Sequence, residues 1–218
     1  LSRVTVSLDT LDPDIFKQMS GRNLDIRKIL FGIEAAQKSG LTPIKINCVV
    51  QRNINEESIL DLINFFKGTE HIIRFIEYMD VGNLNKWNLS EVVSSKEILE
   101  IIKKEFSVIP LDPSFKGEVA TRYSYDNGSG EIGLISSVTN PFCSSCTRSR
   151  LTTDGKLVTC LFANTGLDLK KILRSGGNDN DLTELIIDYW ENREDRYSEL
   201  RSATTSNKKK IEMYQLGG

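Results

Sequence analysis

The first hundred residues alternate between two hydrophobic periods. Short runs rich in β-branched residues predict strands, and between them apolar residues recur at intervals of three and four, as on one face of a helix. The predicted strands cover residues 3–9, 43–50 and 71–79, and the predicted helices cover residues 26–40, 55–66 and 94–106. A loop with Pro13 is expected after the first strand, and Ser94 or Ser95, followed by Glu97, predicts a capping box at the start of the third helix. This alternation predicts a parallel sheet with helices outside it.

The pattern changes after Pro110. Residues 111–138 show short alternating stretches around the sequence DNGSG, residues 126–130, which predicts a β-hairpin. The alternation of strand and helix therefore does not continue into this part of the chain.

Beyond a segment rich in cysteine, the pattern becomes helical again. The predicted elements are a short helix at residues 168–175, a longer helix from Asp181 and a polar, basic linker at residues 202–210. Asp181 and Glu184 form a D-x-x-E start for the longer helix.

The composition narrows the classes of protein to consider. At 218 residues the chain can bury one large core or two small ones. A net charge of −2 gives no bulk attraction for nucleic acid or for an anionic membrane, and no apolar run reaches the length of about 18 residues that spans a membrane. Four cysteines, three of them within 18 residues, are too few and too clustered for a secreted disulfide scaffold, so we expect the cytoplasm or, in a eukaryote, the mitochondrion. The opening residues already have a strand pattern without a start methionine, and we expect the chain to begin inside a larger fold.

Three of the cysteines have the spacing of a metal site. Cys143, Cys146 and Cys160 form a C-x2-C-x13-C pattern, and a predicted turn at Asp154-Gly155 folds the chain back, so that the third thiol approaches the other two. The spacing favours zinc slightly over an iron–sulfur cluster and leaves both open, with a redox or accidental arrangement as a third alternative.

The fourth ligand separates these alternatives. A structural zinc site needs four ligands, and the chain offers Cys48 or its single histidine, His71. Cys48 lies in the middle of a predicted strand and is better explained as a buried core thiol, whereas His71 opens a strand and suits a capping or surface position. An iron–sulfur cluster with three cysteine ligands needs no fourth side chain, because one iron stays open to a small molecule.

Two arginines beside the cysteines favour the open cluster. Arg148 and Arg150 alternate on an extended stretch, so both are expected to face one side. A closed zinc site does not need two guanidinium groups, whereas a site that receives an anionic nucleotide does, because guanidinium groups bind phosphates and purine edges through paired hydrogen bonds. A solvated pair of surface arginines is the simpler alternative, and the neighbouring cysteines weaken it.

A lysine and an asparagine share one side of the second predicted strand. Lys45 and Asn47 are two positions apart, so they face the same way, and Cys48 faces the helices. We expect the side of Lys45 and Asn47 to face the interior of a barrel, although Lys45 could equally be an ordinary surface residue.

Six segments, in this order and spacing, resemble one known family: SLDT, PIKIN, RFIEYMDVGN, GEIGLISSVTNPFCSSCTRSRL, DGKLVTCLF and the terminal GG. The family is that of GTP 3′,8-cyclases, radical S-adenosylmethionine enzymes of molybdenum cofactor biosynthesis, and the resemblance runs through nearly the whole chain. It implies an α/β fold, in which residues 1–107 are part of an incomplete six-unit (βα) barrel of TIM type. Residues 108–218 would then form a C-terminal α+β domain that carries an iron–sulfur cluster, binds GTP and ends in a flexible tail.

The resemblance also implies what this chain does not contain. In the family, a C-x3-C-x2-C loop holds a first 4Fe–4S cluster and cleaves S-adenosylmethionine, and no such loop occurs in these 218 residues. We expect that loop in an N-terminal part, so the chain by itself is expected to be inactive.

Roles are carried over residue by residue. The implied ligands of the second 4Fe–4S cluster are Cys143, Cys146 and Cys160, and the implied GTP contacts are Lys45, Arg148 and Arg150. The implied neighbours of S-adenosylmethionine are Ser7, Asn47, Met79 and, more weakly matched, Arg74. Gly217 and Gly218 match a tail that reaches into the active site, where glycine fits a narrow space. The segment CSSC departs from the family, in which Gly and Asp are commoner between the cysteines, and this affects only the loop conformation.

The implied activity is that of a lyase with S-adenosylmethionine as co-substrate. It converts GTP to (8S)-3′,8-cyclo-7,8-dihydroguanosine 5′-triphosphate, which passes to cyclic pyranopterin monophosphate synthase. A homodimer is compatible with this assignment, and no nucleic acid or membrane partner is expected. Two alternatives stay open: a zinc-stabilised binding module on an α/β half-fold, and another radical S-adenosylmethionine enzyme with an auxiliary cluster.

Overall fold

The computed structural model describes residues 1–201 and 210–216. The chain divides into two compact units. The first comprises Leu1–Met79 and Asn88–Asn140, and the second comprises Asp80–Trp87 and Pro141–Gly218. Within the described ranges, no helix combines the length and the hydropathy that a membrane span requires.

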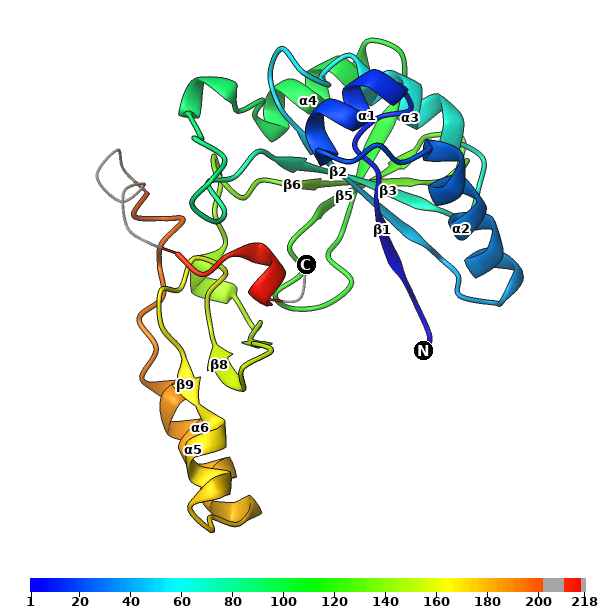
Figure 1. Ribbon diagram of the computed structural model, residues 1–218. Coiled ribbons are helices and arrows are strands. Elements are labelled where there is room, and N and C mark those ends of the chain that lie inside the picture. The colour runs from blue at the N-terminus through cyan, green and yellow to red at the C-terminus, as the bar shows by residue number, and fades with distance from the viewer. Residues whose placement is uncertain (202–209, 217–218) are drawn as a thin grey trace. The chain divides into compact units, whose positions relative to one another are not determined.

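Six strands form the sheet of the first unit, in the order β1-β2-β3-β6-β5-β4 (Figure 1). The strands are β1 (Thr5–Ser7), β2 (Lys45–Val50), β3 (Ile72–Glu77), β4 (Val108–Leu111), β5 (Thr121–Tyr125) and β6 (Glu131–Ile135). The strands β1, β2, β3 and β6 pair in that order and run parallel. Beyond β6, the strands β5 and β4 extend the sheet by antiparallel pairing. The predicted parallel strands and the predicted hairpin, which joins β5 to β6, are therefore confirmed.

The sheet continues past the division that we expected between residues 107 and 108. The next three strands, β4, β5 and β6, join the sheet of the first unit, which extends to Asn140. The physical reason is strand pairing: β6 finds its parallel partner in β3, and the hairpin brings β5 with it. The sheet has two edges, β1 and β4, and closure of a barrel stays a prediction.

Four helices cover one face of this sheet (Figure 1). They are α1 (Pro13–Ser20), α2 (Ile26–Lys38), α3 (Ser58–Phe66) and α4 (Ser95–Lys103). In β2, Ile46, Cys48 and Val50 are fully buried beneath them, while the alternate residues Lys45 and Asn47 are only half-buried. The opposite orientations predicted for Cys48 and for Lys45 with Asn47 are confirmed, and Cys48 is a core thiol.

Local signals explain where these helices start. Ser94 and Glu97 form the predicted capping box of α4, with Glu97 N–H donating to Ser94 Oγ at 3.2 Å and Ser94 N–H donating to Glu97 Oε2 at 2.9 Å. The expectation of a plain loop around Pro13 is wrong, because Pro13 is the first residue of α1. Asp12 caps that helix by accepting hydrogen bonds from Asp14 N–H and Ile15 N–H, at 2.8 and 2.9 Å.

A buried carboxylate joins three parts of the first unit. Glu77, the last residue of β3, is fully buried and faces the helices. Its Oε1 accepts hydrogen bonds from Ser95 N–H at 2.7 Å and from the Thr139 hydroxyl at 2.6 Å. Its Oε2 accepts from Val138 N–H and Thr139 N–H, both at 2.8 Å. Glu77 thereby connects the start of α4 to the loop after β6.

The second unit contains a small antiparallel sheet and two helices. The sheet has the order β7-β8-β9, with β7 (Arg150–Leu151), β8 (Lys156–Val158) and β9 (Leu167–Asp168), and the helices are α5 (Leu169–Arg174) and α6 (Asp179–Glu191). The predicted turn between β7 and β8 is confirmed, with Gly155 at φ 81° and its N–H donating to Thr152 O at 2.9 Å. The predicted start of α6 at Asp181 is too late, because Asn178 caps the helix and forms the capping box with Asp181.

Candidate functional site

A row of paired residues crosses the sheet of the first unit. Ser7 in β1 pairs with Asn47 in β2, Asn47 pairs with Arg74 in β3, and Arg74 pairs with Gly133 in β6. Directly paired residues on neighbouring strands point to the same face of a sheet. That face is the one that the helices leave uncovered, because Cys48, the next residue after Asn47, points into the core. The structure thus brings together three of the residues predicted to lie near S-adenosylmethionine.

The side chains of this row are held in place. Arg74 Nε donates to Asn47 Oδ1 at 2.9 Å. A Cβ atom at Gly133 would lie 3.0 Å from Arg74 Cγ and 3.2 Å from Ala120 Cβ, closer than most Cβ contacts, so the glycine leaves room for the Arg74 side chain. Sequence reasoning missed Gly133, although a glycine inside a strand pattern is a known signal of close approach by another group.

Lys45 adds a second cation on the same face. It is half-buried, two residues before Asn47 in β2. Burial, followed by the positive charges of Arg74 and Arg3, lowers the pKa of Lys45. Burial also lowers the pKa of Arg74. Two partly desolvated cations beside an amide make a surface that suits an anionic group of a ligand. Met79 is half-buried two residues beyond the end of β3 and is not part of the row.

The cysteine segment lies in the second unit. Cys143 begins a short 3₁₀ helix, Cys143–Ser145, and Cys146 N–H donates to Cys143 O at 3.2 Å, which closes the turn that carries both thiols. Cys160 follows β8 by two residues. All three thiols are half-buried and free of disulfides.

Hydrogen-bond donors reach two of the three sulfur atoms. Arg148 Nη2 lies 3.3 Å from Cys146 Sγ, and Phe162 N–H donates to Cys160 Sγ at 3.4 Å. Burial alone would raise the pKa of Cys146, but the hydrogen bonds and charge of Arg148 lower it below its ordinary value. Burial raises the pKa of Cys160 to about 11, and Asp195, Cys143 and Cys146 contribute to this increase. The three thiols are therefore close enough to interact electrostatically.

The donor set suits an iron–sulfur cluster. Three free thiols on two adjacent segments, with N–H groups directed at sulfur, are the features by which proteins hold such clusters. Among residues 1–201 and 210–216, no three His, Cys, Asp or Glu side chains are grouped so that they could hold a metal ion. Cys48 is excluded as a fourth ligand, since it is fully buried in the core of the first unit, where burial raises its pKa far above the ordinary value.

The two predicted arginines lie beside these thiols. Arg150 lies in β7 opposite Val158, and burial and the charge of Arg148 lower its pKa, whereas Cys146 and Cys160 act in the opposite direction. Arg148 is exposed, and its guanidinium lies 4.8 Å from the centre of the Phe142 ring. The second unit thus combines three thiols and two guanidinium groups in one neighbourhood.

The last described residues of the tail are anchored within the second unit. Lys210 Nζ donates to Asp80 Oδ2 at 2.8 Å, and both side chains are 3% exposed. Arg201 Nε donates to the other carboxylate oxygen of Asp80 at 2.9 Å. Asn83 exchanges two hydrogen bonds with the backbone of Lys210, each at 2.8 Å. The predicted tail residues Gly217 and Gly218, and most of the predicted linker, lie outside the described residues.

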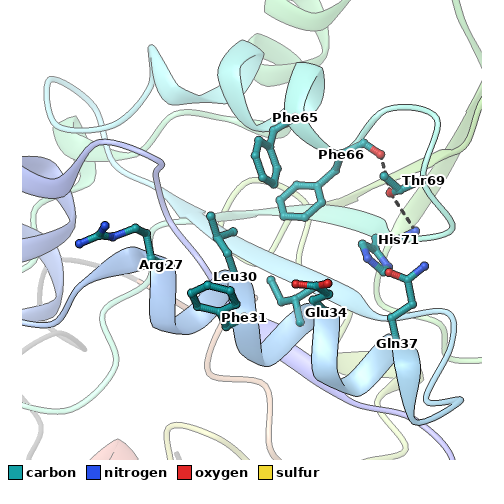
Figure 2. Close-up of a pocket in the computed structure, with 10 residues that line it drawn as sticks. Arg27, Leu30, Phe31, Glu34, Gln37, Phe65, Phe66, Thr69 and His71 are labelled. Carbon is teal, nitrogen blue, oxygen red and sulfur yellow. Dashed lines mark hydrogen bonds between the residues drawn. The ribbon is translucent and has the colours of Figure 1, made fainter.

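A separate groove of about 440 Å³ lies between α2 and α3 and contains none of the predicted ligand-binding residues (Figure 2). Phe31 and Phe65 line it, as does His71, whose N–H donates to Thr69 Oγ1 at 3.2 Å. The His71 ring packs on Phe66, with ring centres 6.0 Å apart, and burial lowers its pKa. His71 is therefore a packing residue in this structure.

Comparison with known proteins identifies the family. A family model described as Molybdenum Cofactor Synthesis C matches residues 71–199. The chain belongs to this family. The matched range begins with β3 and includes both the cysteine segment and α6.

Proteins named GTP 3′,8-cyclase are similar to this chain along all or most of its length. A protein named GTP 3′,8-cyclase from Xanthomonas campestris pv. campestris (strain B100) is 46% identical over 218 residues, which are 100% of this chain and 64% of the relative. A protein of the same name from Acidothermus cellulolyticus is 47% identical over 206 residues, which are 93% of this chain and 57% of the relative. Another, from Staphylococcus aureus (strain Newman), is 42% identical over 222 residues, which cover 100% of this chain and 65% of the relative. The chain therefore spans less than two thirds of the length of these relatives, and its resemblance to the GTP 3′,8-cyclase family is confirmed.

Proposed function

We propose that this chain supplies the nucleotide-binding part of a GTP 3′,8-cyclase in molybdenum cofactor biosynthesis. The observation that carries the proposal is the similarity to proteins of that name over all 218 residues. The arrangement of the second unit supports it, because thiols and guanidinium groups lie together there. Four free cysteines are compatible with a reducing compartment, which we propose to be the cytoplasm.

In the second unit, Cys143, Cys146 and Cys160 would hold a 4Fe–4S cluster. When bound, this cluster supplies an iron with a free coordination position for the guanine of GTP. The protein's own contribution is to bind and orient the nucleotide. Arg148 and Arg150 lie beside the thiols and carry charge-assisted donors suited to phosphate oxygens and purine edges.

In the first unit, Lys45 would bind the phosphates of GTP. Asn47 and Arg74, linked by their hydrogen bond, would bind S-adenosylmethionine, whose carboxylate suits a guanidinium group. Ser7 lies next to Asn47 in the same row, and Met79 would complete the contacts from the end of β3. The family resemblance supports the identity of each ligand. The row of paired residues supports the closeness of Ser7, Asn47 and Arg74 to one another.

The proposed reaction is that of a lyase that forms (8S)-3′,8-cyclo-7,8-dihydroguanosine 5′-triphosphate from GTP, with S-adenosylmethionine as co-substrate. The residues of this chain position the nucleotide and exclude water, which together lower the barrier by preorganisation. We also propose that Gly217 and Gly218 contact the active site and that the product passes to cyclic pyranopterin monophosphate synthase. The 218 residues contain no C-x3-C-x2-C loop, so the chain alone is proposed to be inactive.

Anaerobic reconstitution of the full-length protein with iron and sulfide, followed by metal analysis and GTP titration, tests the proposal. Arg148→Ala and Arg150→Ala are each expected to weaken GTP binding about 10- to 100-fold, because a hydrogen bond to a charged group contributes about 1.5–3 kcal/mol. Arg174→Ala, at an exposed position near the end of α5, is the control and should leave GTP affinity unchanged. Retention of zinc alone would favour the zinc-stabilised binding module, and unchanged affinity in both variants would contradict the nucleotide assignment.

A further inference from the structure

Residues 193–201 form a segment that contacts the cysteine loops at every second position. We call it the bracing segment. It follows α6 and has no regular secondary structure before residue 197. One contact of this segment comes from Glu199, whose Oε1 accepts a hydrogen bond from the backbone N–H of Ser144 at 3.1 Å. Ser144 lies between Cys143 and Cys146, so this bond fixes the backbone of the turn that carries both thiols.

Two more contacts of the bracing segment reach the other cysteines. Arg193 donates from its guanidinium to the carbonyl oxygen of Cys146. Asp195 accepts a hydrogen bond from the hydroxyl of Thr159, the residue before Cys160. Thr159 is 5% exposed, so its hydroxyl is buried and directed at the Asp195 carboxylate. Each of the three cysteines therefore has its own contact from the bracing segment, either at its own backbone or at the adjacent residue.

The same segment is anchored at its far end. Tyr197 donates its hydroxyl to Asp80, and Arg201 donates to the other oxygen of that carboxylate at 2.9 Å. Tyr197 also stacks on Phe162, two residues after Cys160, with ring centres 4.4 Å apart and an interplanar angle of 18°. Asp80 is 2% exposed, so the anchor is buried and the segment has a fixed attachment.

The burial of the bracing segment differs between the residues that contact the cysteine loops and a neighbour that does not. The contacting residues Arg193, Asp195 and Glu199 are half-buried, whereas Glu194 is exposed. The cysteine loops themselves have little regular structure, since the first pair lies in a single 3₁₀ turn and Cys160 lies in a bend after β8. Without a helix or strand to orient the thiols, hydrogen bonds from outside must do so.

We infer that Arg193, Asp195 and Glu199 are positioning residues for the three-cysteine site, one for each thiol. This inference rests on the proposed cluster-binding role of the cysteines. Groups that hydrogen-bond to metal ligands orient them, and their loss typically weakens metal binding about 10- to 100-fold. Nothing in the pattern C-x2-C-x13-C indicates these residues, because they lie more than 30 positions after the last cysteine.

Residue-resolved alkylation of the full-length, metal-loaded protein tests the inference. A thiol that binds metal is protected from an alkylating reagent, and mass spectrometry of peptides measures the rate at each cysteine separately. Glu199→Ala is expected to accelerate alkylation of Cys143 about 10- to 100-fold, Arg193→Ala that of Cys146, and Asp195→Ala that of Cys160. Glu199→Gln should keep nearly full protection, because its amide oxygen still accepts the Ser144 N–H.

The control is Glu194→Ala, an exposed residue of the same segment, and circular dichroism verifies that every variant is folded. Equal acceleration at all three cysteines, or equal acceleration in the control, would overturn the inference, because it would indicate general loosening. Protection that is unchanged in all three variants would also overturn it. If the wild-type protein retains no iron, the proposed function fails. The same alkylation rates are then measured on the zinc-loaded protein, so that a failure of the proposed function is distinguished from a failure of the inference about the three positioning residues.

Discussion

The carboxylate of Glu77 offers the sharpest test of how the first unit is held together. It is fully buried, and four donors share its two oxygens, three of them backbone N–H groups from Ser95, Val138 and Thr139. Replacement of Glu77 by leucine would leave these three N–H groups without an acceptor. Each buried unpaired donor costs about 1–3 kcal/mol, so we expect Glu77→Leu to lower the free energy of unfolding by about 4 kcal/mol.

Glu77→Gln should cost about half as much. Its carboxamide keeps one acceptor oxygen, which can serve Val138 N–H and Thr139 N–H. The Thr139 hydroxyl can rotate to accept from the new NH₂ group, so only the Ser95 N–H loses its partner. A graded loss, from glutamate through glutamine to leucine, is therefore expected.

Urea unfolding followed by far-ultraviolet circular dichroism measures these losses by linear extrapolation, provided that the slope against urea is unchanged. Hydrogen exchange should show that the amides of Ser95, Val138 and Thr139 lose protection first. Glu57→Gln is the matched control, since Glu57 is exposed and makes no capping bond, and it should change the unfolding free energy by less than about 0.5 kcal/mol. A Glu77→Leu variant as stable as the wild type would refute the reasoning.

Three further predictions concern the two candidate sites and the core. Gly133→Val is expected to displace the Arg74 side chain and weaken S-adenosylmethionine binding at least about tenfold, measured by titration calorimetry; unchanged affinity would remove Arg74 from the site. Asp80→Asn should cost about 3 kcal/mol at pH 7, because Lys210 loses its buried counter-charge. Although burial opposes it, hydrogen bonds from Lys210 and Tyr197 lower the pKa of Asp80. This difference should therefore be complete above about pH 4 and disappear as the pH falls through the lower, folded pKa. A difference in urea unfolding that does not shrink as the pH is lowered would be inconsistent with this reasoning. Cys48→Ala should destabilise the protein by about 1 kcal/mol and leave the iron content of the reconstituted protein unchanged, whereas lost iron would make Cys48 a ligand.

Two helices in the structure, α1 and α6, start at positions other than those predicted from the sequence. Asp12 followed by Pro13 is a strong helix start, because aspartate caps and proline suits the first helical position, yet a loop was expected there. At α6, Asn178 and Asp181 could both serve as caps by residue type. The structure uses Asn178, which accepts from the N–H groups of Asn180 and Asp181 at 2.8 and 3.2 Å.

The segment SLDT is an example of a recognisable sequence whose function is largely structural. Asp9 Oδ1 accepts the N–H of Val49 at 2.8 Å, and the backbone carbonyl of Asp9 accepts from Asn55 Nδ2 at 2.8 Å. Thr10 shares a buried hydrogen bond with Ser58 at 2.8 Å. These bonds join the end of β1 to β2 and α3, so this segment stabilises the fold in addition to the ligand contact proposed for Ser7.

The amino-acid sequence by itself determined the local elements of this protein. The strand and helix periods, the capping box at Ser94, the turn before Gly155 and the opposite orientations of Asn47 and Cys48 all follow from interactions within a few residues, which a short window of sequence contains. The spacing of the three cysteines likewise follows from the sequence alone.

Only the tertiary structure decided which distant residues share a site. The row from Ser7 to Gly133 depends on the register of four strands, and the contact of Glu77 with Thr139 spans 62 positions. The approach of Asp195 to Thr159 spans 36 positions and follows from the packing of the second unit. Register and packing are set by the burial of many side chains at once, so no local pattern in the sequence could indicate these partners.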